Sequence, residues 1–450
     1  MPKQLTFLEN PPRAESVRAA AYSGGDRCAE RQQLEEKFAD RLREEPGLGS
    51  LVSYVGNKDV PVLRLYRYKE AFAFRFVEEF LSRFGLTKKD YVFDPFCGMG
   101  TTLFAACRNG IPSVGVDKLP IAVFVARTLP VFCTLRPGQV KEAFEKLRAR
   151  LPKAAPAAVA LDVAIMKVAF PPNTLLALRR WKAVIDELES PLKDVFLLLF
   201  FSILEPCSLT SKDGQFLRLI RDKEVAAPAE ALAQKVAEAE QDIRFIHECK
   251  WGLNGAFPTV HLGDTRDLSG IAFGRKPTAI ITSPPYANRY DYTRTYSLEL
   301  CFHFVRNFDE LKALRFGILR SHIESKVETG EEASHGAVRE VVGLLRERRE
   351  ELNNPRIPDM LTAYFVDMQK VIGEWARVLA RGAKVALVVD NVRFDGELLP
   401  VDLVLSDMAE EAGFDVHEIL VARYKGNSSQ QMGKYGRVPV RESVVVWQRR

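Results

Sequence analysis

The chain has 450 residues, 47% of them hydrophobic, which is ample for a buried core and fits one enlarged catalytic domain or a core with a second domain. No apolar run reaches the length of a membrane span and the N-terminus has no signal-peptide core, so we expect a cytoplasmic protein without membrane contacts. Seven cysteines without a C-x-x-C pair argue against a disulfide framework and a zinc site, so no metal is expected, and the mild net charge of +5 neither requires nor excludes nucleic-acid binding.

The N-terminal part is predicted to lead into the first strand of a sheet. Residues 1–60 are polar and weakly periodic, and we interpret them as an N-terminal extension, helical or partly ordered. Between Tyr66 and Phe84 phenylalanines recur every four residues, at positions 72, 76, 80 and 84, which is the spacing of one helix face. The apolar residues 91–93 then predict a strand.

A glycine-bearing turn follows that strand. It runs Asp94-Pro95-Phe96-Cys97-Gly98-Met99-Gly100-Thr101-Thr102. Residues 101–109 predict the next helix, with Gly110 as its C-terminal cap. Residues 113–117 then predict a second strand, which ends in an acid.

The middle of the chain is predicted to be mostly helical. Residues 136–255 have this character, and the very apolar stretch 195–204 is too short to span a bilayer and long enough for a buried core helix. A strand followed by an acid returns at 260–264, and residues 278–281 predict another strand shortly before Ser283.

The C-terminal part is predicted to complete the sheet. Residues 303–360 are rich in charge, and the amphipathic stretch 368–379 precedes residues 384–390, which have the pattern of a fully buried strand. Residues 418–424 and 443–447 flank a polar loop and predict an antiparallel hairpin at the edge of the sheet. Strands that alternate with helices indicate an α/β fold.

The turn after the first strand has features of a nucleotide-cofactor site. Glycine lets a backbone approach a cofactor where a β-carbon would collide, and Gly98 and Gly100 form a G-x-G here. Leu103 replaces the third glycine of the dinucleotide fingerprint, which disfavours a nicotinamide or flavin enzyme. Asp94 precedes the turn, and Asp117 ends the next strand at about the spacing of a carboxylate that holds ribose hydroxyls. The alternative is that both acids are helix caps.

A second motif, Ser283-Pro284-Pro285-Tyr286, follows another predicted strand. The exocyclic amine of a base is a poor nucleophile, and accepting both of its protons in hydrogen bonds localises its lone pair. Ser283 Oγ and the Pro284 carbonyl suit this task, because two prolines fix the backbone that presents them. Tyr286 would stack on a base that has left the double helix. Together with the glycine-bearing turn, the motif indicates methyl transfer to an amine of nucleic acid; taken alone, it could be a structural turn.

Together these motifs resemble those of the amino-directed DNA methyltransferases that use S-adenosylmethionine. The hallmarks of that family are a D-P-F-x-G-x-G-T cofactor loop and a [DNS]-P-P-[YF] catalytic loop, and both are complete here. The resemblance covers residues 64–135, 256–300 and 361–450. It implies a class I methyltransferase (Rossmann-like) α/β fold: a mostly parallel seven-stranded sheet with a C-terminal antiparallel hairpin and helical insertions.

The resemblance also implies roles for individual residues. Asp94 would bind the methionine part of the cofactor with Phe96 packed near it, Asp117 would hold the ribose, and Asp264 would lie near the adenine amine. The implied cofactor-binding residues are Asp94, Pro95, Phe96, Gly98, Gly100, Thr101, Asp117 and Asp264. The implied catalytic residues are Ser283, Pro284, Pro285 and Tyr286. Serine at the first catalytic position is commoner in enzymes that act on cytosine N4, and aspartate or asparagine in those that act on adenine N6.

We therefore expect a site-specific DNA methyltransferase that transfers a methyl group from S-adenosylmethionine to the amine of a flipped base, with cytosine N4 favoured. DNA is the expected partner, and the family implies restriction–modification with a partner restriction endonuclease. Adenine N6 methylation, an RNA or protein amine methyltransferase and a catalytically silent DNA-binding subunit stay open as alternatives. Carbon-5 methylation needs a cysteine nucleophile, but Cys207, in a Pro-Cys pair, has no Glu-Asn-Val partner motif and is interpreted as a packing residue, as is Cys97.

These expectations divide the chain into segments. They are the N-terminal extension 1–60, the cofactor-binding half 61–135, a helical insert 136–255, the catalytic-loop part 256–302, a charged helical insert 303–360 and the C-terminal part 361–450. Candidate DNA-contacting segments are 208–214, 287–300, where aromatic residues alternate with arginines, and 424–438. The two inserts and the C-terminal loop compete for the role of target recognition.

Overall fold

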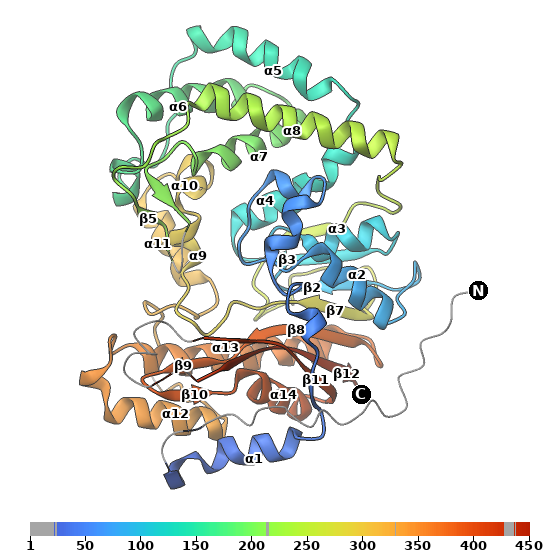
Figure 1. Ribbon diagram of the computed structural model, residues 1–450, viewed down its shortest axis with the longest axis vertical. Coiled ribbons are helices and arrows are strands. Elements are labelled where there is room, and N and C mark those ends of the chain that lie inside the picture. Colours follow the sequence, from blue (N-terminus) through green and yellow to red (C-terminus); the bar gives the residue numbers. More distant parts are fainter. Residues whose placement is uncertain (1–21, 23–24, 213–215, 329, 427–435, 437) are drawn as a thin grey trace.

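The centre of the protein is an eight-stranded sheet with the order β1-β11-β12-β8-β7-β2-β3-β6 (Figure 1). The structure is a computed structural model that describes residues 22, 25–212, 216–328, 330–426, 436 and 438–450. The strands of the sheet are β1 (Leu42–Glu44), β2 (Val92–Asp94), β3 (Ser113–Asp117), β6 (Thr259–Leu262), β7 (Ala279–Thr282), β8 (Lys384–Asp390), β11 (Phe414–Lys425) and β12 (Val440–Arg449).

Strand directions confirm the predicted fold class. β6, β3, β2, β7 and β8 run parallel to one another, whereas β12 runs antiparallel between β8 and β11. The C-terminal strands are longer than expected, and they do not form the edge of the sheet. β1, from the segment interpreted as an N-terminal extension, pairs in parallel with β11 and adds the eighth strand.

Helices cover both faces of the sheet. Successive residues of a strand point to opposite sides, and here apolar residues lie on both sides and need to be covered. Val92 packs into the apolar core on one face and its neighbour Phe93 into the core on the other. The helices packed on the first face include α2 (Phe74–Arg83), α3 (Thr101–Arg108), α4 (Pro120–Thr128) and α10 (Ser297–Glu299). Those on the second are α1 (Ala29–Phe38), α12 (Gly336–Glu347), α13 (Ile357–Val378) and α14 (Val401–Glu411).

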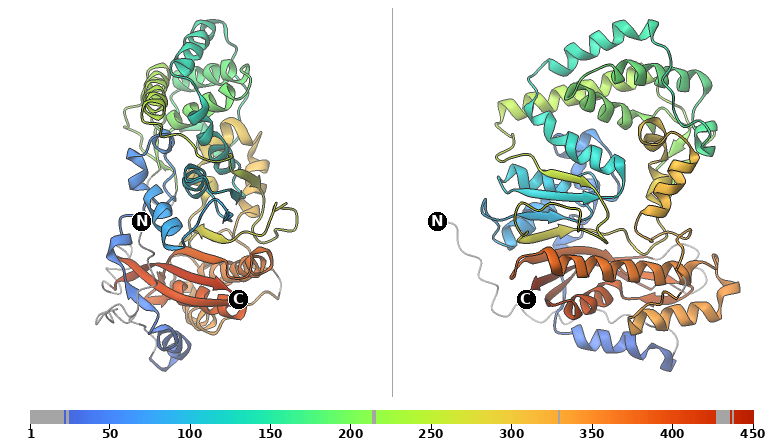
Figure 2. Two further views of the ribbon diagram at one scale, coloured as in Figure 1. Left: turned by 90° about the vertical axis from the view of Figure 1, so that its right-hand side faces the viewer. Right: turned by 180° about the vertical axis from the view of Figure 1, so that it is seen from behind.

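The predicted helical insert forms a lobe at one end of the molecule, while α1 and α12 lie at the other end (Figures 1 and 2). The helices of this lobe are α5 (Gln139–Arg150), α6 (Pro172–Asp186), α7 (Leu192–Leu204) and α8 (Pro228–Glu248). The apolar stretch 195–204 lies within α7 and is almost wholly buried, as expected for a core helix. A small hairpin, β4 (Thr210–Ser211) with β5 (Arg218–Leu219), joins α7 to α8.

The remaining elements are shorter. The helices α9 (Tyr292–Thr295) and α11 (Phe308–Gly317) lie between β7 and α12 in the chain, and the hairpin of β9 (Val392–Phe394) with β10 (Glu397–Leu399) lies between β8 and α14. In the described part of the chain no single helix is long and apolar enough to cross a membrane, although one pair bent by 115°, Pro120–Thr134 with Gln139–Lys153, meets that test on length and composition.

The helix predicted across residues 66–84 is shorter than the phenylalanine spacing indicated. It begins at Phe74, and the preceding residue has extended backbone angles. The buried Asn57 side chain donates to the Phe72 carbonyl at 2.9 Å and accepts from the Phe74 N–H at 2.7 Å. Because this distant asparagine satisfies backbone groups on both sides of Ala73, residues 66–73 follow another path and reach the carboxyl edge of the sheet.

The chain order creates a switch point between β2 and β7. After β2 the chain builds β3 and β6 on one side, and it then returns to build β7 and β8 on the other. The loops after β2 and β7 therefore diverge, which opens a crevice at the carboxyl ends of the strands, where ligands of such sheets bind.

Candidate active site

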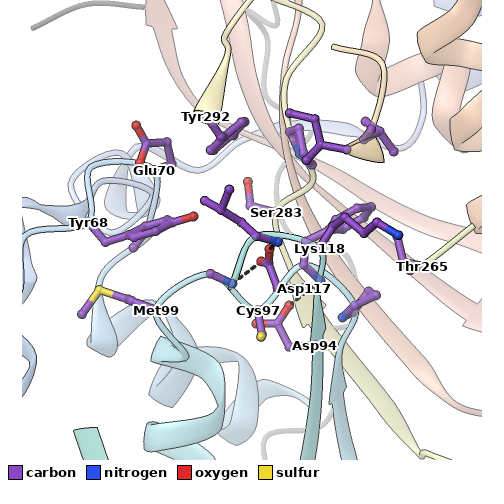
Figure 3. A pocket seen from close by; sticks show the side chains of 18 of the residues that line it. Tyr68, Glu70, Asp94, Cys97, Met99, Asp117, Lys118, Thr265, Ser283 and Tyr292 are labelled. Atoms are coloured by element: carbon purple, nitrogen blue, oxygen red, sulfur yellow. Dashed lines mark hydrogen bonds between the residues drawn. The ribbon is translucent and has the colours of Figure 1, made fainter. Parts of the chain in front are cut away.

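A first cavity, called cavity A, opens at this switch point (Figure 3). Its walls come from six parts of the chain: the segment before α2, the glycine turn after β2, the end of β3, the turn after β6, the segment from the loop after β7 to α9, and the residues that follow α11. The lining residues used below are Tyr68, Glu70, Ala71, Asp94, Phe96, Gly98, Asp117, Lys118, Asp264, Ser283, Pro285 and Tyr292. Figure 3 shows Asp94, Asp117 and Ser283 near the centre of the view, with Glu70 and Tyr292 above them.

The two glycines of the turn have different structural roles. Gly98 lines cavity A with φ +49°, and a β-carbon there would lie 3.2 Å from the Tyr68 ring. Gly100 has φ +84°, and its β-carbon would lie 2.8 Å from the Ala126 β-carbon on α4. Gly98 therefore leaves space in the cavity that a side chain would fill. Gly100, which is not among the lining residues, lets α3 pack closely against α4.

Asp94 ends β2 and is buried at the base of cavity A. Its Oδ1 accepts hydrogen bonds from the Thr282 hydroxyl at 2.6 Å and the Phe96 N–H at 3.2 Å. Burial raises the pKa of this carboxyl to about 7, although both hydrogen bonds favour the charged form. The carboxyl group of Asp94 thus connects the glycine turn to the end of β7, one residue before Ser283.

Asp117 ends β3 and closes the opposite side of the turn. It accepts hydrogen bonds from the backbone N–H groups of Gly98 and Leu119, each at 2.8 Å. Burial raises its pKa to about 6 against these two bonds. The carboxylate therefore fixes the glycine turn and still borders the cavity.

Asp264 follows β6 and also lines cavity A, but its carboxylate is engaged on the protein side. It accepts from Arg266 Nη2 at 2.7 Å and lies 3.6 Å from Lys118 Nζ. Burial opposes ionisation, yet the bonds from Arg266 outweigh it and hold the pKa of Asp264 below its usual range. Arg266 also donates to the buried Asp367 of α13 at 2.8 Å, so this wall is anchored to a helix.

The loop after β7 separates cavity A from a second cavity, called cavity B. Ser283 and Pro285 line cavity A, while Ser283, Pro284 and Tyr286 line cavity B. Ser283 Oγ donates to the carbonyl of Val388 on β8 at 3.2 Å. The hydroxyl group of Tyr286 donates to Glu442 Oε1 at 3.3 Å. The motif is thus held against β8 and β12, and its serine belongs to both cavities.

Cavity B contains a cluster of four charges from three neighbouring strands. Lys425 Nζ lies 3.2 Å from Asp390 Oδ2 and 2.5 Å from Glu442 Oε1, and Arg423 pairs with the other oxygen of Glu442. Burial raises the pKa of Asp390 to about 7; Lys425 opposes the shift and Glu442 adds to it. Among the described residues, no hydrogen-bond partner is found for the buried Asp390 Oδ1. The cluster therefore places two cations and two carboxylates in the wall of cavity B.

Four residues line both cavities: Glu70, Ala71, Ser283 and Tyr292. We call the boundary that they form between the cavities the passage. For two of them, Glu70 and Ala71, the sequence predicted no part in a binding site. The periodicity of the phenylalanines hid residues 66–73, where the only signal was the concentration of tyrosines and charges before Phe72.

The candidate DNA-contacting segments divide on structural grounds. In the segment 287–300 the hydroxyls of Tyr290 and Tyr296 donate to Glu70, so these tyrosines hold the cavity wall. In the segment 208–214, Lys212 is buried and ion-paired to Glu299, and residues 213–214 lie outside the described residues. Most of the segment 424–438 also lies outside them.

Cys207 is buried at the end of α7 and borders neither cavity. Burial raises its pKa to about 12, which disfavours the thiolate form that a nucleophile needs. Cys97 borders cavity A and is also buried, with its pKa raised by burial. Both positions agree with packing roles.

The sequence was also compared with those of known proteins. No protein-family model matches the chain. The chain is 33% identical to the Type II methyltransferase M.BsoBI of Geobacillus stearothermophilus, across 93% of its own length and 92% of that protein. It is also 33% identical to the Type II methyltransferase M.AvaI of Anabaena variabilis, across 92% of both chains.

Solved structures give weaker similarities. The rRNA methyltransferase aviRa of Streptomyces viridochromogenes is 12% identical with a TM-score of 0.31, covering 88% of this chain and 92% of that chain. TrmN of Thermus thermophilus is 10% identical with a TM-score of 0.27, covering 83% and 48%. The fold is therefore assigned from the strand order itself.

Proposed function

The chain belongs to the type II DNA methyltransferases, site-specific enzymes that use S-adenosylmethionine, and from this premise we propose that it methylates the N4 amine of a flipped cytosine. The observation that carries the proposal is the position of Ser283 in the wall shared by cavities A and B. A methyl group has to pass from one bound molecule to the other, and this serine borders both places.

Cavity A suits S-adenosylmethionine in shape and charge. Four carboxylates border it, from Glu70, Asp94, Asp117 and Asp264, against one ammonium, from Lys118, which suits a ligand with a positively charged sulfur. The absent β-carbon of Gly98 leaves room beside the turn. In our proposal Asp94 holds the methionine part and Asp117 the ribose. The bound cofactor supplies an electrophilic methyl group.

In the proposed mechanism the loop after β7 prepares the amine. Ser283 Oγ and the Pro284 carbonyl accept hydrogen bonds from its two N–H groups, which localises the lone pair on nitrogen. Tyr286 stacks on the extruded base and offsets part of the cost of leaving the DNA stack. Orientation of the two reactants at the passage supplies most of the rate enhancement, and the protein forms no covalent bond.

The charges of cavity B favour cytosine over adenine. Beside its amine, cytosine carries two acceptors, the ring nitrogen N3 and the oxygen O2, whereas adenine carries one nitrogen and then a C–H. Lys425 and Arg423 place cationic donors in the cavity that contains Ser283. We assign Lys425 to the acceptor edge of the base, with Asp390 and Glu442 holding its ammonium in place.

The relatives are named as type II methyltransferases, so we also propose that the protein protects DNA from a restriction endonuclease with the same target sequence. Its expected partners are double-stranded DNA and, in the same cell, that nuclease.

The test is to incubate the purified protein with S-adenosylmethionine and mixed genomic DNA, digest the DNA to nucleosides and identify the methylated base by mass spectrometry. N4-methylcytosine is expected, and the Ser283→Ala variant should form it about a hundredfold more slowly. N6-methyladenine would overturn the choice of base while leaving the family assignment in place.

A further inference from the structure

Glu70 occupies a place that neither motif explains. It lies four residues before α2, and it is the only charged residue among the four that line both cavities. The other three are Ala71, Ser283 and Tyr292. A carboxylate thus borders the passage through which the methyl group has to travel.

The surroundings of Glu70 fix its carboxylate. Its two oxygens accept hydrogen bonds from different hydroxyls, those of Tyr290 and Tyr296. Tyr296 is fully buried, and its ring stacks on that of Tyr68 with the centroids 4.8 Å apart. Tyr68 in turn lines cavity A, so the carboxylate is held by the cavity wall itself.

The carboxylate of Glu70 has no cationic partner among the described residues. Within the part of the chain that the structure describes, Glu70 forms no ion pair with a lysine or arginine, unlike Asp264 with Arg266 and Glu442 with Arg423. Asp94 and Asp117, by comparison, accept backbone N–H groups of their own loops. Glu70 is therefore the carboxylate of cavity A that is held by neutral hydroxyls alone.

We propose that Glu70 recognises the positive charge on the sulfur of bound S-adenosylmethionine and positions its methyl group at the passage toward Ser283. The inference deepens the proposed function and depends on its assignment of cavity A to the cofactor and cavity B to the base. The sulfonium is the part of the cofactor that has to reach the passage, and its charge is lost when the methyl group leaves. A carboxylate at this point favours the charged cofactor over its neutral product.

Binding measurements on the full chain test the charge preference without turnover. Three ligands are titrated by calorimetry: S-adenosylmethionine, the neutral product S-adenosylhomocysteine, and sinefungin, an analogue that carries an amine where the sulfonium methyl would be. The variant Glu70→Gln keeps the size and an acceptor oxygen of the side chain. The matched control is Glu78→Gln, because Glu78 is an exposed residue of α2 that lines neither cavity.

With Glu70→Gln we expect S-adenosylmethionine and sinefungin to bind about tenfold more weakly while S-adenosylhomocysteine changes by less than about twofold. The Glu78→Gln protein should keep the wild-type preference. Equal weakening of all three ligands would assign Glu70 a purely structural role and overturn the proposal, as would unchanged affinities. Production of N6-methyladenine by the wild-type protein would contradict the proposed base but leave this binding test valid.

Discussion

Asp390 on β8 and Glu442 on β12 are direct partners across an antiparallel strand pair, so two carboxylates face each other at the end of the sheet. Such a pair is destabilising unless a cation lies between them. Lys425 supplies that cation from β11, at 3.2 Å from Asp390 and 2.5 Å from Glu442. The same cluster lines cavity B beside Tyr286. Lys425 therefore holds two mutually repelling carboxylates together as a fixed charged group next to the loop after β7.

Replacing Lys425 tests the role of this cluster in base binding. For Lys425→Met we expect DNA methylation at subsaturating DNA to fall about tenfold to a hundredfold, because a charged hydrogen bond to the base is lost. Affinity for S-adenosylmethionine should stay within about twofold. The matched variant Lys425→Arg keeps the charge and should retain more activity. Steady-state kinetics with DNA varied give the measurement, and an unchanged KM for DNA with an unchanged kcat would remove Lys425 from base recognition.

Removing the serine hydroxyl separates catalysis from cofactor binding. We expect Ser283→Ala to lower kcat about a hundredfold, since one of the two acceptors that localise the amine lone pair is gone. Tyr286→Ala should act mainly on the KM for DNA through lost stacking. Ser82→Ala, on the exposed face of α2, is the control. Calorimetric titration with S-adenosylmethionine accompanies the kinetics, and a parallel loss of cofactor affinity in Ser283→Ala would show that the loop is structural.

The buried carboxyl of Asp94 makes stability depend on pH. Its pKa is raised from 3.8 to about 7 in the folded chain, so the folded state binds more protons than the unfolded state between about pH 4 and 7. Its contribution to stability is therefore present below pH 4 and is lost as the pH rises through 7. In Asp94→Asn the drop in unfolding free energy between pH 5 and 7.5 should be smaller by about 2–3 kcal/mol.

Urea unfolding at the two pH values measures this difference. The exposed Asp40→Asn serves as control, since its side chain is 73% exposed. If Asp94→Asn loses as much stability as the wild type over this range, the proton uptake belongs to other groups, of which Asp117 and Asp390 are the first to examine.

Gly100 should tolerate no side chain. Gly100→Ala combines a left-handed backbone with a β-carbon 2.8 Å from that of Ala126, and we expect a loss of about 2–4 kcal/mol in the free energy of unfolding. Gly85 has φ +66° and open space around it, so Gly85→Ala isolates the backbone term and should cost about 1 kcal/mol. Equal losses in the two variants would show that α4 yields to the added methyl group.

Much of the fold and half of the site could be predicted from local patterns. The strands 113–117 and 384–390 have the predicted bounds, because strands buried on both faces give continuous apolar runs. The two motifs meet at one cavity, because both follow parallel strands whose carboxyl ends share an edge. The prediction of a helix before Phe74 was wrong. The side chain of Asn57, which lies outside the predicted helix, hydrogen-bonds the backbone on both sides of Ala73.

By itself, then, the sequence determined the α/β class, the glycine turn after β2 and the Ser283–Tyr286 motif, since each depends on the conformational preferences of a few adjacent residues. Only the tertiary structure decided that β1 extends the sheet beyond β11, that Glu70 borders the passage and that Asp390, Lys425 and Glu442 meet in cavity B. The reason is physical: strand register and loop paths are set by packing and hydrogen bonds between segments far apart in the chain, and no local pattern encodes which of them will touch.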